Sequence, residues 1–421
     1  MTGTPRLSRR AALKGVAALP VAGMPIAGLA APATAAIPAE PSIVLPARSA
    51  FQQSELAYLD NGTQHPISLG ARAAIDRYLA KRSLDPAAQG YVLDEDGLLA
   101  KFARLINADP GEVCFVQSTT AGEQAVIRAL GLPQEGGHVV SDTLHFFGSL
   151  PLYEDLAQRG VYVSWVRAVD GRIRLEDMRA ALRPDTRLVA LSLVSTINGF
   201  EHDLKAVCDL AHAHGALVYA DVIHAAGCVP FDVKASGVDF AACASYKWLM
   251  GDFGLGFLYV RKDVLPQLNR QNWGYYGIAS FTSHVYPLDP PGATVADYAF
   301  RDDASGAFAI GTHAHTVIAQ LHHSLDWIAR IGVAQIQRHA QVLLAHVREE
   351  LPRRGYRLLT PPEARTPLLA VELCDARKLL GEPLKAAGVQ IAISANRFRL
   401  SPSVQNDHTD IERFLRALPR A

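Results

Sequence analysis

The chain has 421 residues, 49% of them hydrophobic, so it is long enough to bury a large core and to divide into two domains. Its 41 basic residues balance 41 acidic residues, which argues against a nucleic-acid partner and favours a small neutral or zwitterionic substrate. Its five cysteines are scattered without the close pairs of a zinc or redox motif, and we predict no metal site.

The first 36 residues are predicted to be an export signal. Residues 8–14, Ser-Arg-Arg-Ala-Ala-Leu-Lys, precede an apolar stretch that ends in the small-x-small cleavage site Ala33-Thr34-Ala35. The segment resembles a twin-arginine signal, although Ala12 replaces the usual phenylalanine. Pro20 and Pro25 interrupt the apolar run, which is short for a membrane anchor. We therefore expect a periplasmic or secreted protein that passes through the twin-arginine translocon and has no stable membrane association.

Apolar runs of strand length alternate with helical patterns from about residue 55 onward. The runs show little polar alternation, which indicates strands buried on both faces. This alternation predicts an α/β fold with a mostly parallel seven-stranded sheet in a large domain, residues 50–300. The predicted strands are 113–116, 138–140, 161–166, 188–193, 217–220, 240–244 and 256–260, and the helical patterns are 123–130, 150–158, 175–182 and 204–214.

The last third of the chain predicts a long loop followed by a smaller domain. Residues 270–304 are rich in Gly, Pro, Tyr and Asp and read as a loop before a helix that begins near Thr316. Long loops in compact domains are often functional. Strand-like segments at 368–373, 389–393 and 398–400 then predict a small C-terminal α/β domain, residues 315–421.

A hydroxyl-rich segment follows the first strand of the sheet. Ser118, Thr119 and Thr120 open a helix, where free N–H groups and hydroxyls form an anion site suited to a phosphate. An ordinary helix N-cap is the alternative.

Asp221 and His224 follow the very apolar strand at 217–220. An unpaired carboxylate is costly there, so Asp221 needs a cationic partner, and a protonated pyridine nitrogen would serve. His224 is close enough in sequence to share the pocket, with a purely structural histidine as the alternative.

Lys247 lies in the run 244–251, among small, aromatic and aliphatic residues. A buried ammonium is costly, so the side chain should lose its proton, pair, or be bonded covalently as a Schiff base. A snorkelling surface lysine is the alternative. A phosphate cradle, the carboxylate of Asp221 and this lysine, in that order, describe pyridoxal phosphate held at three points. Arg399, on a predicted strand, could bind an amino-acid carboxylate through two parallel hydrogen bonds, with a surface ion pair as its alternative.

Together these motifs resemble the class V aminotransferase family of fold-type I pyridoxal-phosphate enzymes, which also holds cysteine desulfurases, kynureninases and isopenicillin N epimerase-like proteins. The resemblance runs from the opening Tyr-Leu-Asp-Asn of residues 58–61 nearly to the end of the chain. It includes Asp-x-x-His at 221–224, Ser-x-Lys at 245–247 and Arg-x-Ser at 399–401.

The resemblance implies a role for each matched residue. Lys247 would hold the internal aldimine and move the proton at Cα, Asp221 would pair with the pyridine nitrogen, and His224 would lie beside the ring. Arg399 and Asn61 would bind the substrate. The implied cofactor contacts are Ser118, Thr119, Thr120, Ser245 and Tyr246 around the phosphate, Phe146 (with His145 one step away) stacked on the ring, Thr196 (or, less favoured, Asn198) at the phenolic oxygen, and Gly311 and Thr312.

Gly311 and Thr312 would reach the phosphate of a neighbouring subunit, which implies a homodimer with shared active sites. A nucleophilic cysteine is absent from residues 381–396, before the arginine motif, and this argues against a cysteine desulfurase. We rank aminotransferase-type chemistry first, in the tailoring of a secreted metabolite. An isopenicillin N epimerase-like epimerase or a C–S or β-lyase is the alternative. A non-catalytic binding protein would not need Lys247, and the first strand is not followed by the Gly-x-Gly-x-x-Gly of a nucleotide-binding protein.

Overall fold

The computed structural model describes residues 43–84, 93–270 and 272–419, so the predicted export signal lies outside the described residues. None of the described helices is both long and apolar enough to cross a membrane. The α-helices are α1 (Leu69–Leu84), α2 (Glu95–Leu105), α3 (Thr119–Ala129), α4 (Leu132–Glu135), α5 (Leu150–Gln158), α6 (Leu175–Ala181), α7 (Leu204–His212), α8 (Val233–Ser236), α9 (Ala304–Phe308), α10 (His315–Ile331), α11 (Val333–Arg353), α12 (Ala376–Ala386) and α13 (His408–Ala417). The strands are β1 (Ala57–Tyr58), β2 (Val113–Val116), β3 (His138–Asp142), β4 (Tyr162–Val166), β5 (Thr186–Ser192), β6 (Leu217–Asp221), β7 (Phe240–Ala244), β8 (Gly256–Val260), β9 (Ile278–Ser283), β10 (Ala296–Phe300), β11 (Arg357–Leu358), β12 (Leu369–Glu372), β13 (Val389–Gln390), β14 (Ala392–Ile393) and β15 (Arg397–Leu400).

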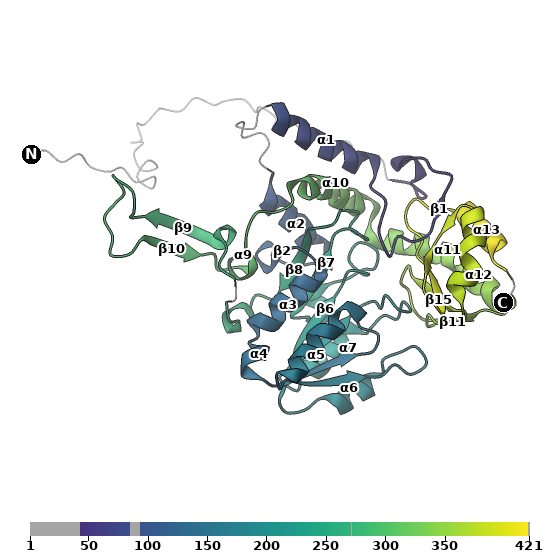
Figure 1. The fold of residues 1–421 in the computed structure, drawn as a ribbon, viewed down its shortest axis with the longest axis horizontal. Coiled ribbons are helices and arrows are strands. Elements are labelled where there is room, and N and C mark those ends of the chain that lie inside the picture. The colour runs from purple at the N-terminus through teal and green to yellow at the C-terminus, as the bar shows by residue number, and fades with distance from the viewer. Residues whose placement is uncertain (1–42, 85–92, 271, 420–421) are drawn as a thin grey trace, which may run out of the picture. The chain divides into compact units, whose positions relative to one another are not determined.

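A seven-stranded sheet forms the centre of the large α/β region (Figure 1). Its strand order is β2-β8-β7-β6-β5-β3-β4, and only β8 runs antiparallel to its neighbours. This confirms the predicted α/β fold with a mostly parallel seven-stranded sheet.

The central strands are buried on both faces, which explains why their sequences lack polar alternation. Successive side chains enter two different cores because a strand alternates its side chains between the faces of the sheet. Ala242 and Leu258 pack into the core that contains Val126 of α3. Cys243 and Phe257 pack into the core on the other face, which includes Phe102 of α2, whose ring stacks on Phe257 at 4.1 Å.

Polar side chains gather at one edge of this sheet. β2, β3, β5, β6 and β7 run in the same direction, so their carboxyl ends meet at that edge. Ser118 and Lys247 directly follow two of these strands, and Asp142, Ser192 and Asp221 are the last residues of three others. Parallel strand direction therefore collects residues that are far apart in sequence.

A second sheet lies in the C-terminal part of the chain. It has the antiparallel order β11-β12-β15-β14 and packs against α11, α12 and α13 around a core that includes Leu343, Leu384, Phe398 and Phe414. The segments predicted as strands at 368–373 and 398–400 form β12 and β15. Residues 42–421 group into one structural unit, so the predicted boundary between a large and a small domain stays a prediction.

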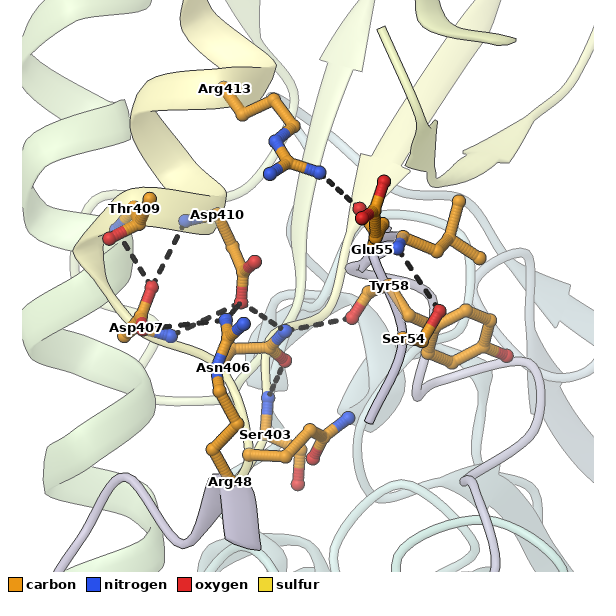
Figure 2. A network of polar contacts seen from close by, with 12 residues as sticks. Arg48, Ser54, Glu55, Tyr58, Ser403, Asn406, Asp407, Thr409, Asp410 and Arg413 are labelled. Carbon is orange, nitrogen blue, oxygen red and sulfur yellow. Dashed lines mark hydrogen bonds and ion pairs between the residues drawn. The ribbon is translucent and has the colours of Figure 1, made fainter. Parts of the chain in front are cut away.

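The segment before α1 is tied to the C-terminal helix. Figure 2 shows Arg48 directed at the start of α13, where its Nη2 lies 2.7 Å from Asp410 Oδ2 and 3.4 Å from Asp407 Oδ2. Asn406 Nδ2 donates to the Tyr58 carbonyl at 2.9 Å in the same network. These contacts, with a bridge between Asp60 and Ser401, hold residues 58–63 beside β15.

Residues 270–304 differ from the sequence-based expectation. The predicted long loop is wrong over its middle, because β9 and β10 pair there as an antiparallel hairpin that extends away from the sheet (Figure 1). Most side chains of the hairpin are exposed, including those of Phe281 and Tyr298. With so little burial, the segment lacks the hydrophobic pattern by which strands are recognised in a sequence.

Candidate active site

Lys247 lies in the tight turn after β7, at the polar edge of the large sheet. Its side chain is buried, with only 8% of the residue exposed, and its Nζ lies 3.1 Å from Nε2 of His224. Burial lowers the pKa of Lys247 to about 8, although the nearby Asp221 acts in the opposite direction. A lysine in this position is easily converted to the free amine.

His224 favours that free amine by its hydrogen bonds. Its Nδ1 accepts from the indole N–H of Trp248 at 3.2 Å, so in a neutral ring the proton is on Nε2. Burial, together with Lys247 and Arg399, lowers the pKa of His224 well below its ordinary value and keeps the ring neutral. The Nε2–H therefore donates to Lys247 Nζ, and only an unprotonated amine has the lone pair to accept it.

Asp221 ends β6 and is also buried. Its Oδ1 accepts from the Ile223 N–H at 2.9 Å, and Ser192 Oγ donates to Oδ2 at the long distance of 3.5 Å. Burial raises the pKa of Asp221, while that N–H, His145 and Lys247 favour the carboxylate form. The site therefore holds a carboxylate that a further cationic partner would stabilise.

The structure brings His145, and not Phe146, toward Asp221. His145 is buried, and its Nδ1 lies 2.9 Å from Oγ of Ser192, the same hydroxyl that contacts Asp221. Phe146 packs against Phe147 with 4.8 Å between ring centroids. His145, the second choice for ring stacking, is therefore the residue that lies beside Ser192 and Asp221.

The residues predicted to bind a phosphate, Ser118, Thr119 and Thr120, lie at the start of α3. Ser118 Oγ accepts from the Ala121 N–H at 3.1 Å, which is the N-cap alternative, and Thr119 Oγ1 accepts from the Ala244 N–H at 2.9 Å. The second bond ties α3 to the end of β7, three residues before Lys247. Each hydroxyl accepts a backbone N–H in these bonds and keeps its own proton, so Ser118, Thr119 and Thr120 can donate to an anion together with the free N–H groups of the first turn.

Ser245 and Tyr246 shape the lysine turn. Ser245 Oγ donates to the Asp252 carbonyl at 2.7 Å, so this hydroxyl stabilises the turn. Tyr246 stacks on Phe253, with 4.4 Å between centroids, and its own centroid lies 5.7 Å from Lys247 Nζ. The aromatic pair thus covers one side of the lysine.

Arg399 lies on β15 in a second polar pocket. Its Nη1 donates to Thr196 Oγ1 at 2.7 Å and to the Thr196 carbonyl at 2.9 Å, and Nη2 donates to Thr63 Oγ1 at 3.1 Å. Asp60 Oδ1 lies 3.6 Å from Nη2. Burial lowers the pKa of Arg399 against the pull of Asp60. The sequence-based prediction missed Asp60, which stands in the Tyr-Leu-Asp-Asn segment that it singled out, and Thr63, which lies two residues beyond that segment.

Asn61 and Asn198 are held in the framework. Asn61 Nδ2 donates to the Ser401 carbonyl at 2.8 Å, and its Oδ1 accepts from Gln405 at 2.7 Å. The structure therefore does not bring Asn61 to the site as a free substrate ligand, because both ends of its amide are engaged. Asn198 Nδ2 donates to the Gly171 carbonyl at 2.7 Å, so Thr196 is the member of that pair that joins Arg399.

Gly311 and Thr312 make no hydrogen bond with Lys247 among the described residues. They line a pocket of about 470 Å³ together with Gln117 and Ala121, beside the start of α3. Their expected reach to a neighbouring subunit stays a prediction.

The donor set fits pyridoxal phosphate. A free amine at Lys247 suits the aldehyde, the buried carboxylate of Asp221 suits a protonated ring nitrogen, and the start of α3 suits the phosphate. Among the described residues, no group of three or more His, Cys, Asp or Glu side chains is arranged to hold a metal ion.

Comparison with known proteins places this geometry in a family. The family model described as "Aminotransferase class-V" matches residues 96–393. The chain is 28% identical over 307 residues to the "Uncharacterized aminotransferase YcbU" of Bacillus subtilis, with 73% of this chain and 78% of that protein covered. It is 30% identical over 296 residues to a "Probable cysteine desulfurase" of Methanothermobacter thermautotrophicus, covering 67% of this chain and 69% of that protein.

A solved structure shows the same fold. The cysteine desulfurase CsdA from Escherichia coli superimposes with a TM-score of 0.76 at 19% identity, covering 89% of this chain and 98% of that chain. The described chain thus has the fold-type I architecture that the sequence motifs predicted.

Proposed function

Because this chain belongs to the aminotransferase class-V family, it is a pyridoxal-phosphate-dependent enzyme, and we propose that it acts at the amino-bearing Cα of an amino acid or of a natural product that contains one. When bound, the cofactor supplies an electron sink for the bonds of Cα. The observation that carries the proposal is the buried Lys247, whose pKa is lowered to about 8 and whose Nζ lies 3.1 Å from His224, next to the buried carboxylate of Asp221.

Each residue at the polar edge of the sheet would have a separate role in the reaction. Lys247 would bind the aldehyde carbon of the cofactor, and its amine, once released, would take the proton from Cα and return it. The Nε2–H of His224 keeps that amine oriented, since His224 is itself fixed by Trp248. Asp221 would hold the protonated ring nitrogen, and the start of α3 would hold the phosphate.

Arg399 would bind the carboxylate of the substrate. Thr196 takes both Nη1 hydrogens and Thr63 takes one Nη2 hydrogen, so the guanidinium is fixed. The donors left for a carboxylate are the second Nη2 hydrogen and Nε–H, which has no hydrogen-bond partner among the described residues. Asp60 Oδ1, at 3.6 Å from Nη2 of Arg399, balances the charge of the guanidinium. A substrate carboxylate would compete with Asp60 for this charge.

We propose aminotransferase-type chemistry first. The relative of Bacillus subtilis is named an uncharacterized aminotransferase, and the amine of Lys247 is suited to moving a proton away from Cα. Epimerisation and lyase chemistry use the same proton removal and differ in where the proton or the leaving group goes.

Cysteine desulfurase activity is excluded from the proposal on the position of the thiols. The relatives include desulfurases, so this is the second candidate. Cys374 is the exposed cysteine of the chain, and it follows β12 four residues beyond Ala370, the partner of Arg399. At about 3.3 Å per residue, that is roughly 13 Å along the strand pair from Arg399. Burial raises the thiol pKa of the others, which are Cys114, Cys208, Cys228 and Cys243.

Replacement of Lys247 tests the central assignment. The purified enzyme should show a visible absorption band that borohydride removes, with the reduced cofactor attached to the peptide of Lys247. Lys247→Ala should lose both the band and activity, by about 1000-fold or more. Lys205→Ala, on the exposed face of α7, is the matched control and should keep both. Retention of the borohydride-sensitive band in Lys247→Ala would make the assignment wrong.

Isotope exchange distinguishes amino transfer from epimerisation. Candidate amino acids are incubated with the enzyme in deuterated water, and keto product and deuterium at Cα are measured. Keto product with amino transfer supports the proposal, whereas exchange with inversion and no keto product supports an epimerase. Persulfide formation from cysteine that disappears in Cys374→Ser would restore the desulfurase candidate.

The proposal also includes a homodimer and export of the protein. Exposed apolar side chains on the β9–β10 hairpin and the position of Gly311 and Thr312 at a pocket support a subunit contact. The twin-arginine pattern in residues 1–36 supports secretion and, with it, metabolite tailoring. Light scattering of the enzyme, and the N-terminal sequence of protein recovered from the periplasm or medium, test the two points. A monomer, or an uncleaved cytoplasmic protein, would contradict them.

A further inference from the structure

A buried acid, Glu123, lies behind the lysine site and has no part in the proposed function. It is on α3 with 2% of its surface exposed. Tyr153 OH donates to its Oε1 at 2.6 Å, Ser149 Oγ donates to its Oε2 at 2.5 Å, and His145 Nε2 lies 2.9 Å from Oε1. Burial acts to raise the pKa of Glu123, but His145 and the two hydroxyls outweigh it and hold that pKa below its ordinary value. Glu123 is therefore a carboxylate that accepts from three donors.

The hydrogen-bond partners of His145 fit a ring that is protonated on both nitrogens. Ser192 Oγ lies 2.9 Å from His145 Nδ1 and, at the long distance of 3.5 Å, donates its single proton to Asp221 Oδ2, an arrangement that leaves the hydroxyl oxygen to accept from Nδ1. Glu123, as a carboxylate, accepts from Nε2. Both ring nitrogens of His145 are then donors, and an imidazole with two N–H groups is a cation.

The charged groups around His145 also favour a ring that carries a positive charge. Glu123 approaches from α3, while Asp142 of β3 and Asp221 of β6 contribute two further carboxylates. Asp142 is itself paired with His202 at 3.3 Å. Burial lowers the pKa of His145, but these carboxylates outweigh it and raise that pKa above its ordinary value. The remaining groups are Tyr153 of α5, which donates to Glu123, and Lys247, whose charge also favours the ionised form of Asp221.

We propose that Glu123 is a positioning residue that keeps His145 as a fixed cation, directed through Ser192 at Asp221. This inference rests on the proposed function, because it assigns the cation a task toward the cofactor. With a cation behind it, Asp221 stays ionised in its buried position and can hold the protonated ring nitrogen. If the charge of Glu123 is removed, His145 loses its proton, and Asp221 then takes up a proton itself and pairs more weakly with the ring.

The direct test is the protonation state of His145 in the full-length holoenzyme. Nitrogen NMR of histidine-labelled enzyme, assigned with His145→Gln, should show two protonated ring nitrogens for His145 at about pH 7.5. Glu123→Gln keeps the size of the side chain and should leave one ring nitrogen without a proton. Asp239→Asn is the matched control, since Asp239 is an equally buried carboxylate paired with Arg261 and His212 elsewhere on the sheet, and it should leave His145 unchanged. A neutral His145 in the native enzyme, or two protonated nitrogens in Glu123→Gln, would overturn the proposal.

A second readout follows the cofactor. Glu123→Gln should weaken cofactor binding by about tenfold, as expected for the loss of one charge-assisted contact, and Glu123→Asp should restore part of it. If Glu123→Gln does not fold, Ser192→Ala serves instead, because it breaks the link to Asp221 and keeps the His145–Glu123 pair. It should weaken cofactor binding while His145 keeps its Nε2 proton, and unchanged binding would contradict the relay through Ser192. Failure of the proposed function is distinguishable, because it would appear as a native enzyme with no borohydride-sensitive band, whatever the state of His145.

Discussion

The two polar pockets of this protein are built in different ways. The lysine pocket collects His224, Asp221 and Lys247 from neighbouring strands of one parallel sheet, so the backbone ladder fixes their spacing. The arginine pocket joins Arg399 of β15 to Thr196, after β5, and to Asp60, before α1, with no shared sheet.

Their electrostatics differ as well. In the lysine pocket burial lowers the pKa of Lys247 and raises that of Asp221, so both groups are shifted toward neutrality and a cofactor completes them. In the arginine pocket Arg399 already has a carboxylate neighbour in Asp60. Under the proposed function, the first pocket would hold a permanent group, whereas in the second pocket a substrate carboxylate would compete with Asp60 for Arg399 in each cycle.

Replacement of Arg399 should give the largest change that separates the pockets. Arg399→Lys keeps the charge but loses the two parallel donors, so the KM for carboxylate-bearing amino acids should rise about 100-fold. The borohydride-sensitive cofactor band should stay as in the native enzyme. Steady-state kinetics and absorption spectra measure the two effects, with Arg357→Lys, an exposed residue of β11, as control. Loss of cofactor in Arg399→Lys would show that the pockets are not independent.

Replacement of Asp60 should have a smaller effect, which improves substrate binding but lowers the stability of the fold. Asp60→Asn removes the competing carboxylate, so the KM for the same substrates should fall about tenfold. It also leaves a buried guanidinium without its counter-ion, which should cost about 3 kcal/mol in the free energy of unfolding. Kinetics and urea denaturation measure both, and Asp326→Asn, at an exposed position of α10, is the control. A higher KM without loss of stability would contradict the idea of anion exchange.

The pH dependence of cofactor loading sharpens the description of the lysine pocket and is the smallest effect. Lys247 has its pKa lowered to about 8 from the ordinary 10.5, so below about pH 8 it is mostly an ammonium and above it mostly a free amine. The rate at which apoprotein forms the borohydride-sensitive bond should therefore rise with pH and level off above about 8. Stopped-flow absorbance measures this rate. A rate that keeps rising toward pH 10 would mean that burial does not activate Lys247.

Much of the fold was predictable from the order of apolar runs. Each predicted strand of the large sheet is present, because strands buried on both faces need continuous apolar sequence. The β9–β10 hairpin was not predicted, since its exposed side chains impose no such pattern.

For the site, the sequence by itself determined the residue types that carry the chemistry and their order along the chain. Lys247, Asp221 and Arg399 stand out because charged groups in apolar surroundings are costly, and that cost is visible in the neighbouring letters. Only the tertiary structure shows that His145, and not Phe146, lies near Asp221, and that the amide of Asn61 is already hydrogen-bonded. It also identifies Asp60 as the partner of Arg399 and Glu123 as the partner of His145. Such choices depend on hydrogen bonds between segments far apart in the chain, and those bonds exist only once the strands, helices and loops have been packed together.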